Sequence, residues 1–209
     1  MENIKTFYAP FSHMIIENFF TDSQIELALN ELETYDYLPP EKTGAAEAED
    51  GTPLKKNQAV FIDGLYKENR KDSFILNNYG STLFTDEFKT ACKTHDLLFN
   101  YVLETNFDET LVSYYENSDY YKRHCDSAVF TCLLYLFKTP KKFEGGEITF
   151  HYRDIEYTPP FKNNMCIVFP SIVDHSVNPV KMHQDDLNKG NGRYCLSKFL
   201  DIKGNFRKY

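Results

Sequence analysis

The stretch from Leu111 to Phe137, LVSYYENSDYYKRHCDSAVFTCLLYLF, decides the fold class. Leu111–Tyr115 and Val129–Phe137 are rich in the β-branched and aromatic residues that favour strands, and the turn-forming run Glu116–Asp119 follows the first of them. The same alternation of short strands and turns continues downstream, with further strands expected at 146–152, 165–169 and 194–202. Many short strands separated by regular turns predict a barrel or sandwich.

The first half of the chain has a helical pattern instead. Thr21-x-x-Gln24 is a capping box, and apolar residues follow it at helical spacing. A second helix is expected to begin near Thr85, with an apolar stripe that runs from Phe88 to Val102. These helices are predicted to pack outside one sheet of the β-rich half.

Residues 39–57 lie between the two expected helices and contain three prolines and two glycines among alanines and charged residues. This composition predicts a mobile surface loop of unusual length. Such a loop is either a tolerated insertion or a lid over a site, and the sequence does not choose between the two.

The composition restricts the class of protein. With 42% hydrophobic residues and 33 aromatic side chains (15 Tyr and 18 Phe), the chain can bury a core and is not disordered. A net charge of −8 disfavours nucleic acid as a partner, because phosphate binding requires clustered Lys and Arg. The five cysteines form no C-x-x-C pair and no apolar run reaches membrane-spanning length, so a cytoplasmic protein with buried free thiols is expected.

The most informative motif is His124-Cys125-Asp126, an H-x-D pair within or beside a strand. Residues i and i+2 of a strand face the same way, so the imidazole and the carboxylate can converge on one ion while Cys125 points to the other face. His175 follows a later strand. Two histidines and one carboxylate form the facial triad of non-haem Fe(II) oxygenases. By itself an H-x-D pair is a weak signal, since a hydrogen-bonded strand histidine is common.

The residues around this motif strengthen it. Arg193 begins the last expected strand, and a guanidinium is the natural bidentate partner of a carboxylate. His151 and His183 are rival ligands, but a hydrogen-bonded strand residue and a solvated loop residue are the simpler interpretations of the two. Asp174, beside His175, is expected at the surface.

A family resemblance follows from the ordered set Tyr114, Tyr121, His124-x-Asp126, Tyr135, Gly145-Gly146-Glu147, His175 and Arg193. This set resembles the 2-oxoglutarate- and Fe(II)-dependent dioxygenases, in particular their prolyl-hydroxylase-like branch, over about residues 110–202. The resemblance implies a mainly β fold with flanking α-helices: a double-stranded β-helix (jelly-roll) core with the N-terminal helices packed on one sheet.

The resemblance also implies the site. His124, Asp126 and His175 would be the iron ligands, and Arg193 would hold the distal carboxylate of 2-oxoglutarate together with the hydroxyl of Tyr135. Tyr114 would lie near the metal-bound end of the cosubstrate, and Tyr121 is a candidate substrate contact. Fe(II), 2-oxoglutarate and O₂ are the implied cofactors, with ascorbate as a candidate reductant.

Departures from the family limit the transfer of substrate. The loop between His175 and Arg193 is longer than in the oxygen-sensing hydroxylases, and collagen-type prolyl hydroxylases usually have Lys in place of Arg193. Phe199 stands where relatives often have Trp and where the nucleic-acid demethylases of this superfamily have a second arginine, so demethylation is disfavoured. The complete triad with Arg193 argues against a non-enzymatic binding module.

We therefore expect one dioxygenase domain over residues 1–209, with helical support and the mobile loop in 1–109 and the catalytic jelly-roll in 110–202. The expected reaction is hydroxylation of a prolyl residue in a protein or peptide, with release of succinate and CO₂. Hydroxylation of a free amino acid or another small molecule is the alternative.

Overall fold

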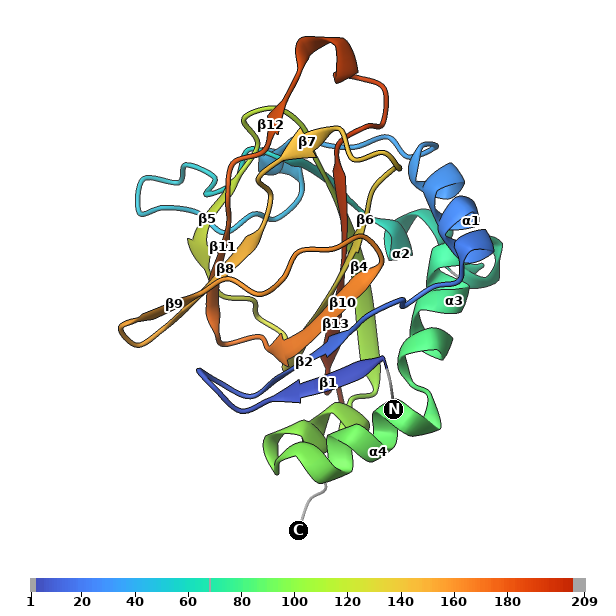
Figure 1. The fold of residues 1–209 in the computed structure, drawn as a ribbon, viewed down its shortest axis with the longest axis vertical. Coiled ribbons are helices and arrows are strands. Elements are labelled where there is room, and N and C mark those ends of the chain that lie inside the picture. The colour runs from blue at the N-terminus through green and yellow to red at the C-terminus, as the bar shows by residue number, and fades with distance from the viewer. Residues whose placement is uncertain (1–2, 68, 205–209) are drawn as a thin grey trace.

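A computed structural model of the protein describes residues 3–67 and 69–204. Its β-strands form two main antiparallel sheets that face each other (Figure 1). The larger sheet has seven strands in the order β1 (Ile4–Phe7), β2 (His13–Ile16), β10 (Met165–Pro170), β6 (Phe130–Leu136), β13 (Arg193–Asp201), β4 (Phe107–Tyr115) and β3 (Gln58–Phe61).

The smaller sheet contains β5 (Tyr121–His124), β11 (Asp174–Val177), β8 (Ile148–Tyr152) and β9 (Ile155–Tyr157), in that order. A separate short pair joins β12 (Lys181–Met182) to β7 (Phe143–Glu144). Two facing antiparallel sheets with helices on the outside of one form the predicted double-stranded β-helix, so the predicted fold class is confirmed.

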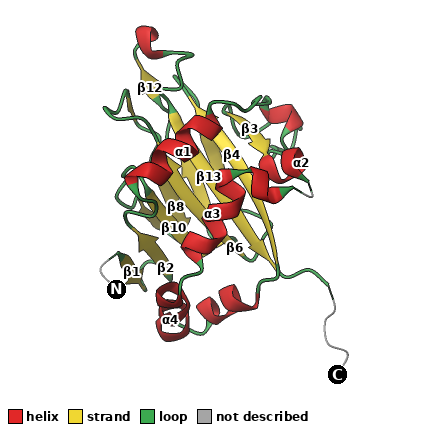
Figure 2. Ribbon diagram, turned by 90° about the vertical axis from the view of Figure 1, so that its right-hand side faces the viewer, coloured by secondary structure: helices red, strands yellow, loops and turns green. Residues whose placement is uncertain are grey.

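The helices cover the outer face of the larger sheet (Figure 2). They are α1 (Asp22–Leu32), α2 (Ile62–Tyr66), α3 (Phe74–Leu83) and α4 (Asp86–His95), with 3₁₀ turns at Pro40–Lys42, Arg70–Asp72, Leu98–Glu104 and Gln184–Asp186. The predicted capping box at Thr21 and Gln24 begins α1, and Thr85 caps α4. Within the described residues no helix has the length and apolar character needed to cross a bilayer.

The second predicted helix is shorter than its apolar stripe suggested. It ends at His95, and Asp96 adopts an extended conformation. The Asp96 carboxylate then accepts a hydrogen bond from the backbone N–H of Phe99, the second residue of a separate 3₁₀ helix. Aspartate competes with helical hydrogen bonds in this way, so the stripe spans two short helices.

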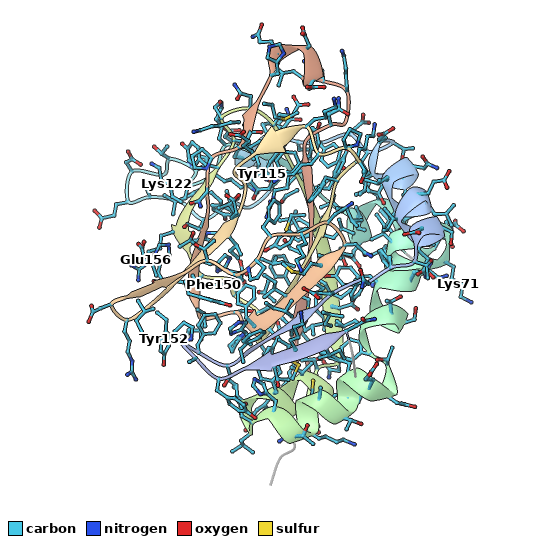
Figure 3. All side chains as sticks on the ribbon, in the orientation of Figure 1. Lys71, Tyr115, Lys122, Phe150, Tyr152 and Glu156 are labelled. Atoms are coloured by element: carbon cyan, nitrogen blue, oxygen red, sulfur yellow. The ribbon has the colours of Figure 1, made fainter. Side chains whose placement is uncertain are left out.

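The larger sheet separates two apolar cores because alternate residues of each strand face opposite sides. Leu134 and Leu196 pack against the helices, whereas Leu133 and Cys195 face the smaller sheet. Figure 3 shows Tyr115 and Phe150 in the space between the two sheets. Residues of β4, β6 and β13 that face inward are therefore available to line a site between the sheets.

Candidate active site

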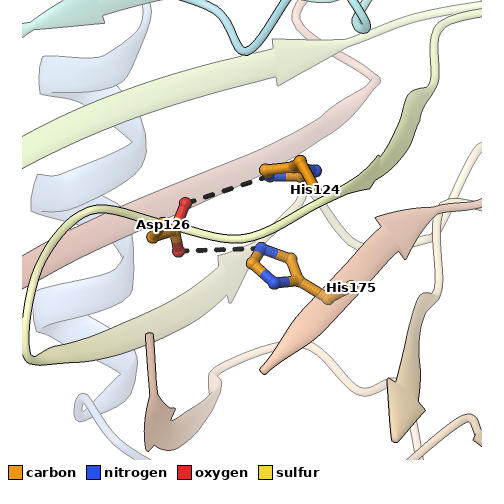
Figure 4. Close-up of side chains that lie close together, drawn as sticks. All are labelled: His124, Asp126 and His175. Carbon is orange, nitrogen blue, oxygen red and sulfur yellow. Dashed lines mark ion pairs between the residues drawn. The ribbon is translucent and has the colours of Figure 1, made fainter. Parts of the chain in front are cut away.

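Three chemically active side chains converge on one point between the sheets. His124 ends β5, Asp126 follows two residues later, and His175 lies on β11 directly opposite His124 in the strand pairing. One oxygen or nitrogen atom from each residue lies within 4.8 Å of the others. The Nε2 atoms of His124 and His175 lie 3.9 and 3.6 Å from the two carboxylate oxygens of Asp126 (Figure 4).

Hydrogen bonds fix the orientation of both imidazole rings. Nδ1 of His124 lies 2.8 Å from the carbonyl oxygen of Lys122, and Nδ1 of His175 lies 3.0 Å from that of Val173. A carbonyl only accepts, so we assign the proton to Nδ1 in each ring, which leaves the Nε2 lone pair facing Asp126. Nδ1–H donation to an outer partner is typical of metal-binding histidines.

The charge states also suit a metal centre. Desolvation by burial lowers the pKa of both His124 and His175 to about 4, so both rings are neutral at neutral pH. Burial raises the pKa of Asp126, although a hydrogen bond donated by Thr131 Oγ1 at 2.7 Å favours the carboxylate. Two neutral imidazoles and one carboxylate on one side of an ion match the donor set of non-haem Fe(II).

The rival residues lie elsewhere. His151 bonds Ser176 Oγ at 2.9 Å and lies 3.3 Å from Glu156, as expected of a hydrogen-bonded strand residue. His183 is an exposed cap of the 3₁₀ turn at Gln184–Asp186. Asp174 pairs with Arg123 at the surface. The structure brings none of these three into the cluster formed by His124, Asp126 and His175.

Arg193 is the most unusual buried residue of the site. Its relative exposure is 0%, and its guanidinium carbon lies 4.6 and 4.8 Å from the ring centres of Tyr115 and Tyr135. None of its three side-chain nitrogens has a hydrogen-bond partner in the described part of the chain. Because a buried charge without partners is costly, this position points to an anionic ligand.

Gly146 makes room for Arg193. A Cβ atom at this glycine would lie 2.9 Å from Cδ of Arg193, and the backbone has a φ of +77°. Both the conformation and the close approach therefore favour glycine at this position. This gives a physical reason for the Gly145-Gly146 turn that was part of the sequence motif.

The two tyrosines predicted to contact the cosubstrate, Tyr135 and Tyr114, lie on opposite sides of the larger sheet. Tyr135 is fully buried beside Arg193, and its hydroxyl has no partner among the described residues. Tyr114 faces the helices: its hydroxyl donates to Glu116 at 2.7 Å and accepts from the N–H of Gly192 at 3.1 Å. The prediction that Tyr114 lines the cosubstrate pocket is therefore corrected, since Tyr115, the next residue on β4, faces inward.

One cavity of about 510 Å³ connects these groups. Arg193, Tyr115 and the three residues of the histidine–aspartate cluster line it. Phe199 lines it too, six residues after Arg193 on the same face of β13. The cavity is therefore large enough for a small cosubstrate together with part of a second molecule.

The long loop lies against this cavity. Gly44, Ala45, Ala46 and Lys55 line it, and Ala46 donates its backbone N–H to the Tyr121 hydroxyl at 3.0 Å. The ring of Tyr121 stacks on His124 with a centroid distance of 3.5 Å. Tyr121 thus connects the loop to the cluster, and the structure places residues 44–46 and 55 at the site.

Sequence reasoning missed three residues of the site: Tyr115, Lys55 and Thr131. Period-two alternation could have found Tyr115, because Tyr115 and Leu111 share a strand face and Tyr114 lies on the other. Nothing local in the sequence indicates that Lys55 or Thr131 would reach the site, since tertiary folding brings both there.

Comparisons with known proteins agree with this geometry. Residues 110–201 match the family model described as the 2OG-Fe(II) oxygenase superfamily. No curated protein sequence matches the chain.

Solved structures share the fold at low sequence identity. A Pseudomonas putida prolyl-4-hydroxylase has a TM-score of 0.60 and 16% identity, with 92% of this chain and 93% of that chain covered. A Trichoplax adhaerens prolyl hydroxylase in complex with a hypoxia-inducible-factor peptide fragment has a TM-score of 0.60 and 15% identity, with 90% and 83% covered. A Burkholderia pseudomallei 2OG-Fe(II) oxygenase family protein has a TM-score of 0.56 and 12% identity, with 92% and 86% covered.

The family match over the catalytic strands and the shared fold confirm the resemblance predicted from sequence. Residues 110–201 are thus similar to the 2OG-Fe(II) oxygenase superfamily, and the chain as a whole shares the fold of the solved prolyl hydroxylases.

Proposed function

We propose that this protein is an Fe(II)- and 2-oxoglutarate-dependent dioxygenase that hydroxylates a prolyl residue in a protein or peptide, with release of succinate and CO₂. The observation that carries the proposal is the buried, unpartnered guanidinium of Arg193, which lines the same cavity as His124, Asp126 and His175. A dicarboxylate that reaches from the histidine–aspartate cluster to Arg193 would satisfy both ends of this arrangement.

Each residue has a defined task in this proposal. Nε2 of His124, Nε2 of His175 and a carboxylate oxygen of Asp126 would hold Fe(II), and the backbone carbonyls behind the two Nδ1 atoms keep the rings aimed. When bound, the iron supplies the oxidising chemistry with O₂ and 2-oxoglutarate. The protein binds and orients the reactants and excludes water from the buried end of the cavity.

The inner end of the cavity suits the distal carboxylate of 2-oxoglutarate. Arg193 offers a planar pair of donors, and the Tyr135 hydroxyl, which also lacks a partner, offers a third. Burial makes each hydrogen bond electrostatically stronger than it would be in water. Burial also raises the pKa of Tyr135 well above its ordinary value, so its hydroxyl stays protonated and able to donate.

The first experiment tests the cofactors without a known substrate. Purified protein with Fe(II), ascorbate and 2-oxoglutarate should form succinate slowly in the absence of a second substrate. His175→Ala should abolish succinate formation and iron binding, whereas His183→Ala, at an exposed histidine outside the cluster, should retain both. Equal activity in His175→Ala and the parent protein would contradict the proposed ligand set.

The second experiment tests the substrate class. The prolyl proposal is supported by the fold shared with the two prolyl hydroxylases and by the cavity, which extends past the cluster to Phe199. Mass spectrometry should detect the gain of one oxygen atom on proline in a panel of peptides. Oxidation of free amino acids alone would favour the small-molecule alternative, and no oxidised proline in any form would end the prolyl proposal.

A further inference from the structure

Lys55 is a buried cation that the long loop brings into the cavity. Its relative exposure is 4%, and it pairs with Tyr121 in an isolated antiparallel bridge. Two backbone hydrogen bonds flank this bridge, from Lys56 N to Tyr120 O at 3.0 Å and from Lys122 N to Leu54 O at 2.8 Å. Directly opposed residues share a face, so Lys55 faces the cavity together with Tyr121, whose ring stacks on His124.

No counter-ion accompanies Lys55 among the residues that the structure describes. The ammonium nitrogen makes no ion pair or hydrogen bond to these residues and lies 5.8 Å from the centre of the Tyr121 ring. A cation–π contact at this distance compensates burial only in part. Desolvation by burial lowers the pKa of Lys55 to about 8, with no neighbouring carboxylate acting against it. An anion bound beside Lys55 would remove this cost.

The charges of the proposed active site indicate that an anion beside Lys55 would come from a molecule other than 2-oxoglutarate. The two positive charges of Fe(II) and that of Arg193 balance Asp126 and the two carboxylates of 2-oxoglutarate, which leaves the charge of Lys55 uncompensated. Glu109, Asp201 and Lys203 also line the cavity, but all three are at least partly exposed and are screened by water. Among the described cavity residues, Lys55 is thus a largely buried lysine whose charge lacks a counter-ion once the cosubstrate is bound.

We propose that Lys55 determines substrate specificity by binding a carboxylate of the molecule to be hydroxylated. This inference rests on the proposed function and extends it, because it assigns an acidic substrate. The carboxylate belongs either to an acidic side chain next to the reacting residue of a peptide or to a free amino acid. The segment at residues 54–56 holds Lys55 against β5, so the ammonium is in place before substrate binds.

The test measures binding to the protein loaded with Fe(II) and 2-oxoglutarate without oxygen, so that no turnover occurs. The probes are matched pairs: capped prolyl peptides with Glu or Gln directly before or after proline, and free proline against prolinamide. We expect the carboxylate member of at least one pair to bind about tenfold more tightly, as one charge-assisted hydrogen bond would give. A preference in the peptide pairs indicates an acidic peptide, and one confined to free proline indicates a free amino acid.

Variants assign this preference to Lys55. Lys55→Met removes the charge at similar volume and should abolish the preference, whereas Lys55→Arg should restore most of it. Lys56→Met is the matched control, because Lys56 is the next residue and its side chain is 51% exposed. Unfolding curves of all three variants check that each is folded.

Three results would overturn the inference. One is a carboxylate preference that survives in Lys55→Met. Another is the absence of any preference in the parent protein, and the third is a loss of 2-oxoglutarate affinity in Lys55→Met equal to that in Arg193→Met, which would make Lys55 a cosubstrate ligand. Failure of 2-oxoglutarate to bind the parent protein would instead reject the proposed function, and this inference with it.

Discussion

Two buried cations on β13 have opposite surroundings. Arg193 and Lys198 are 0% and 1% exposed, and their spacing of five residues places them on opposite faces of the larger sheet. On the helix side, Lys198 forms an ion pair with Asp108 and lies over the ring of Tyr79. On the cavity side, Arg193 has no hydrogen-bond partner in the described chain.

Two buried tyrosines repeat this contrast. The Tyr79 hydroxyl lies 3.0 and 3.2 Å from the carbonyl oxygens of Cys132 and Leu196, whereas that of Tyr135 is unpartnered. On the helix-facing side, Lys198 and Tyr79 have partners within the protein, whereas Arg193 and Tyr135 on the other side do not. Buried polar groups that serve only stability are normally paired, so the unpaired guanidinium of Arg193, with the unpaired Tyr135 beside it, is a sign of ligand binding.

The largest expected effect follows from removing the unpartnered cation. Arg193→Met should weaken 2-oxoglutarate binding by about 100-fold or more, because two charge-assisted hydrogen bonds are lost. The free energy of unfolding without ligand should stay equal or rise, since an uncompensated buried charge is removed. Calorimetry and denaturant titration measure the two quantities. A large loss of stability with unchanged 2-oxoglutarate affinity would make Arg193 a structural residue like Lys198.

The opposite outcome is expected on the helix side. Asp108→Asn leaves Lys198 buried without its carboxylate and should reduce the free energy of unfolding by roughly 2–3 kcal/mol, less than for a fully buried pair because Asp108 is partly exposed. The 2-oxoglutarate affinity should not change. Denaturant unfolding measures the loss, and a decrease in cosubstrate affinity without a loss of stability would contradict the contrast between the two faces.

A pH titration tests the cavity side through its histidines. The metal binds the neutral imidazoles, and burial lowers the pKa of His124 and His175 to about 4. We expect iron to be retained at pH 6.5, where half of unperturbed histidines would be protonated, and to be released as the pH approaches 4. Elemental analysis after dialysis at each pH measures the bound iron. Half-release near pH 6.5 would show that the rings titrate as if exposed.

The smallest effects should distinguish the tyrosines. Tyr135→Phe should weaken 2-oxoglutarate binding about tenfold and leave stability unchanged, because its hydroxyl has no partner in the free protein. Tyr79→Phe should cost about 1 kcal/mol of stability with no change in 2-oxoglutarate affinity.

Tyr114→Phe should lower stability by a similar amount and leave 2-oxoglutarate affinity unchanged, which tests the conclusion that Tyr115, and not Tyr114, faces the cavity. A change of 2-oxoglutarate affinity in Tyr114→Phe would return that tyrosine to the cosubstrate pocket.

Much of the fold could be predicted from the sequence because the deciding signals are local. The capping box at Thr21 and the N-cap at Thr85 lie where helices begin, and each of the five predicted β-rich runs contains a strand. The elements that were not predicted are strands β1, β2, β3, β7, β9, β11 and β12 and helices α2 and α3. All of them except α3 have five residues or fewer, so their patterns are weak and their stability comes from packing onto the rest of the fold.

The residue types of the site were determined by the sequence, and its assembly by the tertiary structure. His124, Asp126, His175 and Arg193 could be identified because metal ligation and carboxylate binding require those side chains in a known order. Whether Tyr114 or Tyr115 faces inward depends on the strand register, in which a shift of one residue reverses the face. Lys55 reaches the cavity only because its loop pairs with β5, and pairing between distant segments leaves no local sequence signal.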